Sequence, residues 1–268
     1  MNKKERLDKI LVDKKLVFTR EKAKRIIMAN QVKVNGVKIN KAGTKIDTDS
    51  VIEIDNISEK YVSRGGLKLE KALHCFEIYP NNLIILDIGA STGGFTDCLL
   101  QHGAKKIYCV DVGYGQLDWK LRNDNRVINI EKTNIRYLDK TIFNFKFDMI
   151  TVDVSFISLK IVLPIVSDLL KSNGKIIALI KPQFEAGREH VKKGGIVDDP
   201  EIHFDTIHNL LKNISSDYIC KNITFSPIKN SPGNIEYLIC CEKNIHGILP
   251  LDNNLIKKTI TEAHCFFA

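Results

Sequence analysis

Apolar residues in the first part of the chain follow two different periods. They recur at helical spacing in residues 6–12 and again in residues 20–27, which predicts two short amphipathic helices, the second with Thr19 as its N-cap. Residues 32–37 alternate apolar and polar side chains and run into an Asn-Gly pair, which is typical of a β-hairpin, and residues 51–54 add a further strand. The pattern predicts a small α+β domain.

This first domain is expected to cover residues 1–58, followed by a linker over residues 59–63. From there on, continuous apolar runs typical of buried parallel strands alternate with stretches at helical spacing. The predicted strands are 83–88, 106–110, 127–130, 147–152, 175–180, 218–225 and 235–241, and the predicted helices are 67–76, 95–101, 159–170 and 202–214. Alternation of this kind predicts a doubly wound, Rossmann-like α/β sheet over residues 64–245, with a C-terminal tail at 246–268.

Charge is distributed unevenly between the two parts. Residues 1–45 hold fourteen Lys or Arg and four Asp or Glu, a net charge of +10, whereas the remaining residues have a net charge of −2. A compact basic module beside a nearly neutral one indicates a polyanion as partner, with an anionic membrane surface as the alternative. No apolar run approaches the ~20 residues that span a bilayer, so we expect a soluble, cytoplasmic protein.

The chain contains seven cysteines, an odd number, and none forms a Cys-x-x-Cys pair. Several lie within apolar runs, as in Tyr108-Cys109-Val110. This usage predicts buried free thiols in a reducing compartment rather than disulfides or a metal site.

The first strand of the second domain ends in a glycine-rich loop, Asp87-x-Gly89-x-x-x-Gly93-Gly94. Glycine lets a backbone approach a ligand closely, and the start of the following helix offers free N–H groups. Asp111 ends the next predicted strand, where a carboxylate can bind the hydroxyls of a ribose. The loop differs in spacing from the Gly-x-Gly-x-x-Gly of dinucleotide-binding domains, which disfavours NAD.

Residues 89–93 also fit Gly-x-Ser-x-Gly, the nucleophile elbow of α/β-hydrolases, and Asp153 and His190 follow in the order of a hydrolase triad. The elbow is expected after several strands, whereas this loop follows the first one. A hydrolase would also leave Asp111 and the basic module without a role, so it is the weaker interpretation.

The first domain resembles the alpha-L RNA-binding motif, which occurs in a small-subunit ribosomal protein, pseudouridine synthases and tyrosyl-tRNA synthetases. The matching segments are Arg6-Leu7-Asp8, Thr19-Arg20-x-x-Ala23 and Val32-x-Val34-Asn35-Gly36. The resemblance implies a basic face that neutralises RNA phosphates, with salt-dependent affinity and little readout of base sequence. The candidate RNA-binding residues are Arg6, Arg20, Lys22, Lys24, Arg25 and Lys33, together with Arg64 at the start of the second domain.

The second domain resembles the FtsJ-like methyltransferases, and nearly the whole chain is similar to the TlyA family. The segments that carry this resemblance are Val62–Leu69 (VSRGGLKL), Asp87–Thr96 (DIGASTGGFT), Asp148–Ser158 (DMITVDVSFIS), Leu179–Glu185 (LIKPQFE) and Gly233–Leu238 (GNIEYL). The family implies a ribose 2′-O-methyltransferase that acts on cytidine in ribosomal RNA of the small subunit, the large subunit or both. Its cofactor is S-adenosyl-L-methionine, and the family also carries the label haemolysin.

The resemblance assigns roles to individual residues. By motif, the Lys-Asp-Lys-Glu catalytic tetrad of FtsJ-like enzymes falls on Lys68, Asp153, Lys181 and Glu236. The implied cofactor contacts are Asp87, Gly89, Ala90, Ser91, Thr92, Gly93, Gly94, Phe95, Asp111, Asn134 and Asp153. Relatives often carry Asp at the position of Asn134, and no metal is implied.

Strand order supports this assignment independently of the resemblance. Asp153 and Lys181 each follow a predicted parallel strand, at the sheet edge where ligands bind such folds. If the last strand is antiparallel to its neighbours, Glu236 at its start lies at the same edge. A ribose hydroxyl must lose its proton to attack a sulfonium methyl, so we expect Lys181 to be the base or the principal activator. Lys68 would be a second cation or would orient the hydroxyl, and the carboxylates would position the lysines.

Two other functions stay open at this point: a catalytically inactive RNA-binding factor of ribosome assembly, and a membrane-lytic haemolysin. The sequence contains no long amphipathic helix with a bare apolar face that would support the second. The expected partner is ribosomal RNA within ribosomal subunits, without a membrane or an obligate protein partner, and the chain is expected to be a monomer or a weak dimer. Residues 183–197 are either a flap over the RNA or a solvated loop.

Overall fold

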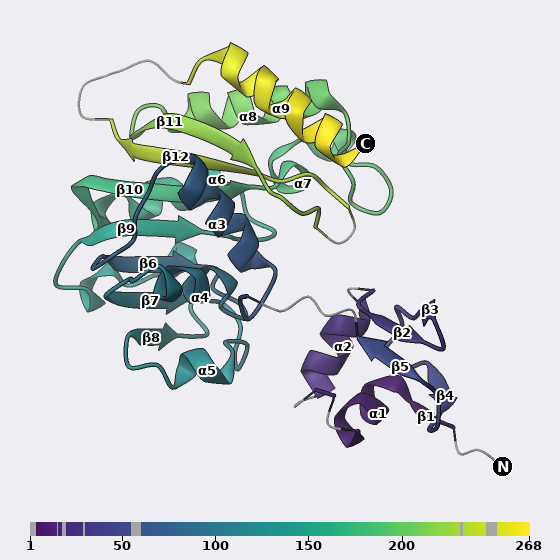
Figure 1. Ribbon diagram of the computed structural model, residues 1–268. Helices are drawn as coiled ribbons and strands as arrows, with labels where there is room; N and C mark the ends of the chain where they lie inside the picture. Colours follow the sequence, from purple (N-terminus) through teal and green to yellow (C-terminus); the bar gives the residue numbers. More distant parts are fainter. Residues whose placement is uncertain are drawn as a thin grey trace. The chain divides into compact units, whose positions relative to one another are not determined.

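The chain forms two compact units, Met1–Glu59 and Lys60–Ala268 (Figure 1). The computed structural model describes residues 4–14, 16–17, 20–28, 30–54, 60–230, 233–244 and 251–268. The predicted N-cap at Thr19, the side chain of Arg25 and residue 59 of the predicted linker lie outside the described part of the chain. Residues 60–63, also expected in the linker, belong to the second unit.

The first unit combines two helices with short strands. Its elements are β1 (Lys4–Arg6), α1 (Leu7–Asp13), α2 (Arg20–Met28), β2 (Val32–Val34), β3 (Val37–Lys38), β4 (Lys45–Asp47) and β5 (Ile52–Ile54). Strand β2 pairs with β3 and β5, and β1 pairs with β4. The predicted helices, hairpin and last strand are thus confirmed. Strands β1 (KER) and β4 (KID) hold at most one apolar residue each, which is too little pattern to be recognised in the sequence.

The Asn-Gly turn of this unit has the geometry that its composition predicts. Asn35 and Gly36 both have positive φ angles, +50° and +79°, as a two-residue hairpin turn of type I′ requires. The Asn35 side chain also accepts a hydrogen bond from the amide of Val51 at 3.0 Å. It therefore ties the turn to the chain that leads into β5.

The second unit is built on a seven-stranded sheet with the order β11-β12-β10-β9-β6-β7-β8. Its strands are β6 (Ile84–Ile88), β7 (Lys106–Val110), β8 (Val127–Ile130), β9 (Phe147–Val152), β10 (Leu170–Ile180), β11 (Tyr218–Phe225) and β12 (Tyr237–Lys243). Strands β8, β7, β6, β9 and β10 are parallel, and β12 is antiparallel to both β10 and β11. The predicted doubly wound sheet is confirmed, and the last strand meets the condition under which Glu236 lies at the same edge as Asp153 and Lys181.

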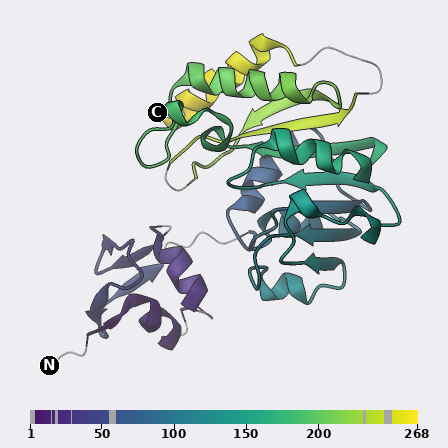
Figure 2. The same cartoon turned by 180° about the vertical axis from the view of Figure 1, so that it is seen from behind.

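Helices cover both faces of this sheet (Figures 1 and 2). The longer ones are α3 (Gly65–Cys75), α4 (Gly94–Gln101), α6 (Leu159–Val166), α8 (Pro200–Ile214) and α9 (Asn253–Phe267), and the short ones are α5 (Trp119–Arg122) and α7 (Pro182–Glu185). Helices α3 and α4 pack on one face, and α6, α8 and α9 pack on the other. Alternate residues of β10 accordingly enter different cores: Ile177 and Leu179 face α3 and α4, and Ile176 and Ala178 face the other layer.

The largest differences from the prediction concern the end of α6 and the C-terminal segment. Helix α6 ends at Val166, a 3-10 turn follows over Ser167–Leu169, and β10 already begins at Leu170. Leu169 and Leu170 are buried because the chain turns into the sheet, and apolar spacing alone does not distinguish this from a longer helix. Helix α9 lies in the segment expected as a tail and packs on α8 and β11 through Ile256, Ile260 and Ala263.

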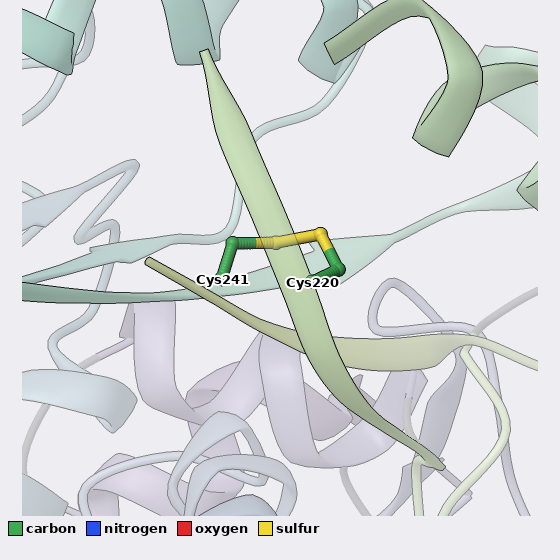
Figure 3. The surroundings of a disulfide bond; sticks show 2 residues. All are labelled: Cys220 and Cys241. Atoms are coloured by element: carbon green, nitrogen blue, oxygen red, sulfur yellow. A yellow bond between two sulfur atoms is a disulfide. The ribbon is translucent and has the colours of Figure 1, made fainter. Parts of the chain in front are cut away.

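The expectation that all cysteines are free thiols is wrong for one pair. Cys220 and Cys241 form a disulfide between β11 and β12 (Figure 3). The two residues lie directly opposite each other in the antiparallel register, so the pairing of the strands brings the sulfur atoms together. Among the free cysteines, Cys98, Cys109 and Cys240 are buried as expected, and burial raises the pKa of their thiols. Cys75 and Cys265 are exposed, which differs from the expectation of buried thiols.

Candidate active site

The loop after β6 rests on a fully buried carboxylate. Asp87 accepts hydrogen bonds from the hydroxyls of Thr96, at 2.6 Å, and Thr151, at 2.8 Å. Burial raises the pKa of Asp87 to about 6, although both hydroxyls oppose that shift. Because this side chain points into the protein, Asp87 supports the loop from below and does not line the cavity described next.

Glycines are required where the loop meets neighbouring backbone. Gly89 has a φ of +78°, and a Cβ atom added to it would lie 2.2 Å from the carbonyl oxygen of Asp153. A Cβ atom on Gly94 would lie 2.3 Å from Ser63 Oγ and 3.1 Å from the Cα atom of Gly65. The two Gly-Gly segments therefore let the starts of α3 and α4 approach each other beside the loop.

Asp111 at the end of β7 connects the glycine loop to the next turn. One carboxylate oxygen accepts the amide of Ser91 at 2.8 Å, and the other accepts the amide of Gly113 at 2.7 Å. A carboxylate has about four lone-pair sites, so acceptor capacity remains for a ligand. Asn134 accepts the amide of Arg136 at 3.0 Å and begins a 3-10 turn, Ile135–Tyr137.

A cavity of about 530 Å³ opens at this edge of the sheet. Five of the predicted cofactor residues line it, namely Gly89, Ser91, Asp111, Asn134 and Asp153. The others lie around the loop rather than on the cavity wall: Asp87, Ala90, Thr92, Gly93, Gly94 and Phe95. Sequence reasoning missed several lining residues: Val112, Gln116, Thr133, Ile135, Arg136, Val154, Ser155, Phe156 and Ile157. All of them lie in the segments that follow β7, β8 and β9, and this position after parallel strands is the signal that would have found them.

The predicted tetrad forms two lysine–carboxylate pairs. Lys68 on α3 donates a hydrogen bond of 2.5 Å to Glu236, and their side chains are 12% and 1% exposed. Lys181 lies 2.6 Å from Asp153, with side chains that are 11% and 21% exposed. Two nearly buried ion pairs in one sheet edge are costly unless each charge keeps its partner, so this arrangement is unlike ordinary solvated surface charge.

Register places three of these residues beside one another. Asp153 follows β9 and Lys181 follows β10, which are parallel neighbours. Ile180 pairs with Tyr237 in the antiparallel register of β10 and β12, so Lys181 and Glu236 are the next residues along the same pairing. The convergence expected from strand order is therefore present at the carboxyl edge of the parallel strands.

The residues of the hydrolase alternative all have other partners. Ser91 Oγ lies 3.3 Å from the side-chain oxygen of Gln116, and His190 lies 3.8 Å from the carboxylate of Glu189. Asp153 pairs with Lys181. A triad needs its serine, histidine and aspartate in contact, and this arrangement does not provide one.

The candidate RNA-binding residues occupy both units. In the first unit, buried Asp8 binds Arg6 at 2.9 Å and Arg20 at 3.0 Å, and these arginines lower the pKa of Asp8 to about 2. The side chains of Arg6 and Arg20 nevertheless remain 44% and 51% exposed. Lys24 is exposed, Lys22 and Lys33 are half-buried, and Arg64 is exposed in the second unit, just before α3. Asp8 thus orients two arginines and leaves them accessible to solvent.

Neither a membrane span nor a metal cluster is found in the described part of the chain. No helix there has both the length and the apolar character needed to cross a bilayer. The described His, Cys, Asp and Glu side chains also form no group of three or more that could hold a metal ion.

Two family models match the chain. Residues 61–243 match the FtsJ-like methyltransferases, and residues 5–52 match the S4 domain.

Several relatives and a solved structure are similar to this chain over most of its length. "Putative rRNA methyltransferase YqxC" of Bacillus subtilis is 52% identical over 89% of this chain and 85% of its own length. The "16S/23S rRNA (cytidine-2'-O)-methyltransferase TlyA" of Mycobacterium tuberculosis is 37% identical over 89% of this chain and 90% of its own length. A solved structure, "Putative hemolysin from Streptococcus thermophilus", superimposes with a TM-score of 0.79 at 42% identity and covers 100% of this chain and 98% of that one.

Proposed function

Since the chain belongs to the FtsJ-like methyltransferases and, within them, to the TlyA family, we propose that it methylates the ribose 2′-oxygen of cytidine in ribosomal RNA. The observation that carries the proposal is the pairing of Lys181 with Asp153 and of Lys68 with Glu236 at the edge that also holds the cavity. The substrate class comes from relatives that modify ribosomal RNA.

The cavity residues fit S-adenosyl-L-methionine. Gly89 lines the cavity and lets the loop backbone pack directly against the backbone of Asp153, where a side chain would clash, and Asp111 has acceptor capacity for ribose hydroxyls. Asn134 and Ile135 line the same wall and suit an adenine ring, with an amide for its polar edge and an apolar side chain for its face. When bound, the cofactor supplies an electrophilic methyl group.

The chain's own residues then act on the ribose hydroxyl. Lys181, as the neutral amine, accepts the hydroxyl proton, while Asp153 holds its Nζ atom in place from 2.6 Å. Lys68, held by buried Glu236, orients the hydroxyl and supplies positive charge near the oxygen that becomes negative. Alignment of the oxygen with the methyl group contributes much of the rate enhancement.

The basic first unit delivers the RNA. Arg6, Arg20 and Lys24 expose charge on a module that matches the S4 domain, and such charges neutralise phosphates without reading bases. Residues 1–58 are therefore the RNA-binding module and 64–245 the catalytic domain. Since ribosomal RNA is the substrate, the protein works in the cytoplasm.

The test is transfer of labelled methyl from S-adenosyl-L-methionine to ribosomal subunits from cells that lack this protein. We expect label on a ribose 2′-oxygen with the wild type, a loss of at least about 100-fold in Lys181→Ala, and equal cofactor affinity by calorimetry. Lys212→Ala, which removes an exposed lysine of α8, is the matched control. Cofactor binding without transfer to either subunit would refute the substrate assignment, and no cofactor binding would leave an RNA-binding assembly factor.

A further inference from the structure

Ser155 contacts the proposed base. Lys181 donates a hydrogen bond of 3.0 Å to Ser155 Oγ, in addition to its ion pair of 2.6 Å with Asp153. Ser155 is exposed and lines the cavity together with Asp153. We propose that Ser155 is a positioning residue for Lys181, an inference that rests on the methyltransferase function proposed above.

The geometry of a lysine amine explains why a second contact matters. A neutral lysine amine has two N–H bonds and one lone pair in a tetrahedral arrangement. Ser155 Oγ accepts one N–H bond of Lys181, and Asp153 holds the Nζ atom as its ion-pair partner, so the two contacts together restrict the direction of the lone pair. With the ion pair to Asp153 alone, the amine can rotate about its Cε–Nζ bond and the lone pair has no unique direction. Ser155 therefore aims the lone pair at one site, where the ribose hydroxyl must lie to lose its proton.

The backbone around Ser155 is shaped to hold this contact. Phe156 has a φ of +64°, a left-handed conformation that is unfavourable for an aromatic residue and persists only where its surroundings enforce it. Strain of this kind beside a cavity is consistent with a serine whose position matters more than local stability.

Two further contacts join the loop after β9 to the segment that follows β10. The rings of Phe156 and Phe184 lie 4.9 Å apart. Glu185 accepts the hydroxyl of Ser158 at 2.6 Å and the amide of Leu159 at 2.7 Å. Together with the Lys181 contacts, these interactions connect residues 153–159 to residues 181–185 along their length. Two of the segments that identify the family are thereby joined, and the serine lies between their ion pair and their aromatic contact.

Isosteric variants test the proposal. Ser155→Val removes the hydroxyl and Ser155→Thr keeps it in a side chain of the same shape. We expect kcat for methyl transfer to fall about 10- to 100-fold in Ser155→Val, to stay within about threefold of the wild type in Ser155→Thr, and cofactor affinity to remain unchanged in both. Ser172→Ala, at an exposed serine of β10, should match the wild type.

Different results would overturn the role of Ser155 and the proposed methyltransferase function. Wild-type rates in Ser155→Val, equal losses in the Val and Thr variants, or a loss of cofactor affinity with unchanged kcat would each overturn the positioning role. If the wild type itself transfers no methyl group to ribosomal RNA, the proposed function fails. In that case crystal structures of the wild type and both variants test the positioning role separately. The role is supported if Lys181 Nζ moves from its wild-type position only in Ser155→Val, and it is overturned if Nζ keeps that position in Ser155→Val.

Discussion

Loss of the positive charge on Lys68 should destabilise the second unit more than the loss of an exposed ion pair does. Lys68→Met keeps most of the side-chain length but leaves the carboxylate of Glu236, which is 1% exposed, without its cation. At a distance of 2.5 Å and an effective dielectric constant of about 20, the gross attraction is about 7 kcal/mol. Desolvation of both groups offsets most of this value.

The measurable cost is that of leaving a buried charge without its partner, about 3–5 kcal/mol. In a unit of this size that corresponds to a decrease in Tm of roughly 6–20 °C. Glu236→Gln should cost less, because the Lys68 side chain is 12% exposed and can move its ammonium group toward water. The double variant Lys68→Met/Glu236→Gln should recover part of the loss of Lys68→Met, since neither charge then remains buried.

Urea unfolding of the full chain, followed by circular dichroism, gives the required double-mutant cycle. The control is Lys140→Met, which breaks an ion pair of 3.0 Å to Asp168, whose side chain is 82% exposed, and should cost at most about 1 kcal/mol. If Lys68→Met costs no more than this control, or if the two single variants add without coupling, the buried pair does not hold α3 to β12 as described.

Three further predictions concern the loop, its buried acid and the basic module. Gly89→Ala should unfold at lower urea concentration and lose cofactor affinity by calorimetry, because its Cβ atom would lie 2.2 Å from a backbone oxygen; Gly115→Ala, with a φ of +68° and no atom within 4 Å of the new Cβ, should cost only about 1 kcal/mol and leave binding unchanged. Burial raises the pKa of Asp87 to about 6, so its protonated form stabilises the fold fully below about pH 4. This stabilisation, about 3 kcal/mol, is lost as pH rises through 6. Asp87→Asn should flatten that part of the stability–pH curve, and an unchanged curve would contradict this effect of burial. Lys24→Ala should weaken RNA binding and reduce the salt slope by about 1 without affecting stability. Arg20→Ala should weaken RNA binding and also lower stability, because it removes a partner of buried Asp8. Equal melting curves for Lys24→Ala and Arg20→Ala would exclude this second role of Arg20.

Much of the fold follows from local pattern. The strands at the centre of the sheet are continuous apolar runs, the hairpin has its Asn-Gly turn, and the basic residues concentrate in the first unit. Strand order also places Asp153 and Lys181 at one edge, because neighbouring parallel strands end at the same side of a sheet. These features depend on residues close together in sequence, where the period of apolar side chains is decisive.

The pairing of side chains is different, since it joins distant parts of the chain. Lys68 and Glu236 are 168 residues apart, and no periodicity relates them. Motif resemblance places both in a tetrad, but only the structure shows that they form an ion pair with each other and that Asp153 pairs with Lys181. The disulfide is similar: Cys220 and Cys241 look like core cysteines in sequence, and they meet because β12 runs antiparallel to β11 in one particular register.

The sequence by itself determined the two modules, the alternation of strands and helices, the glycine loop and the edge at which ionisable residues gather. Only the tertiary structure decided which carboxylate holds which lysine, which hydroxyl completes the surroundings of Lys181, and that Asp8 orients two arginines of the basic module. The physical reason is one of range. Backbone conformation and burial follow a pattern that repeats over a few residues, whereas ion pairs and hydrogen bonds between side chains depend on distances of a few tenths of an ångström, which are set when the whole sheet and both helix layers pack.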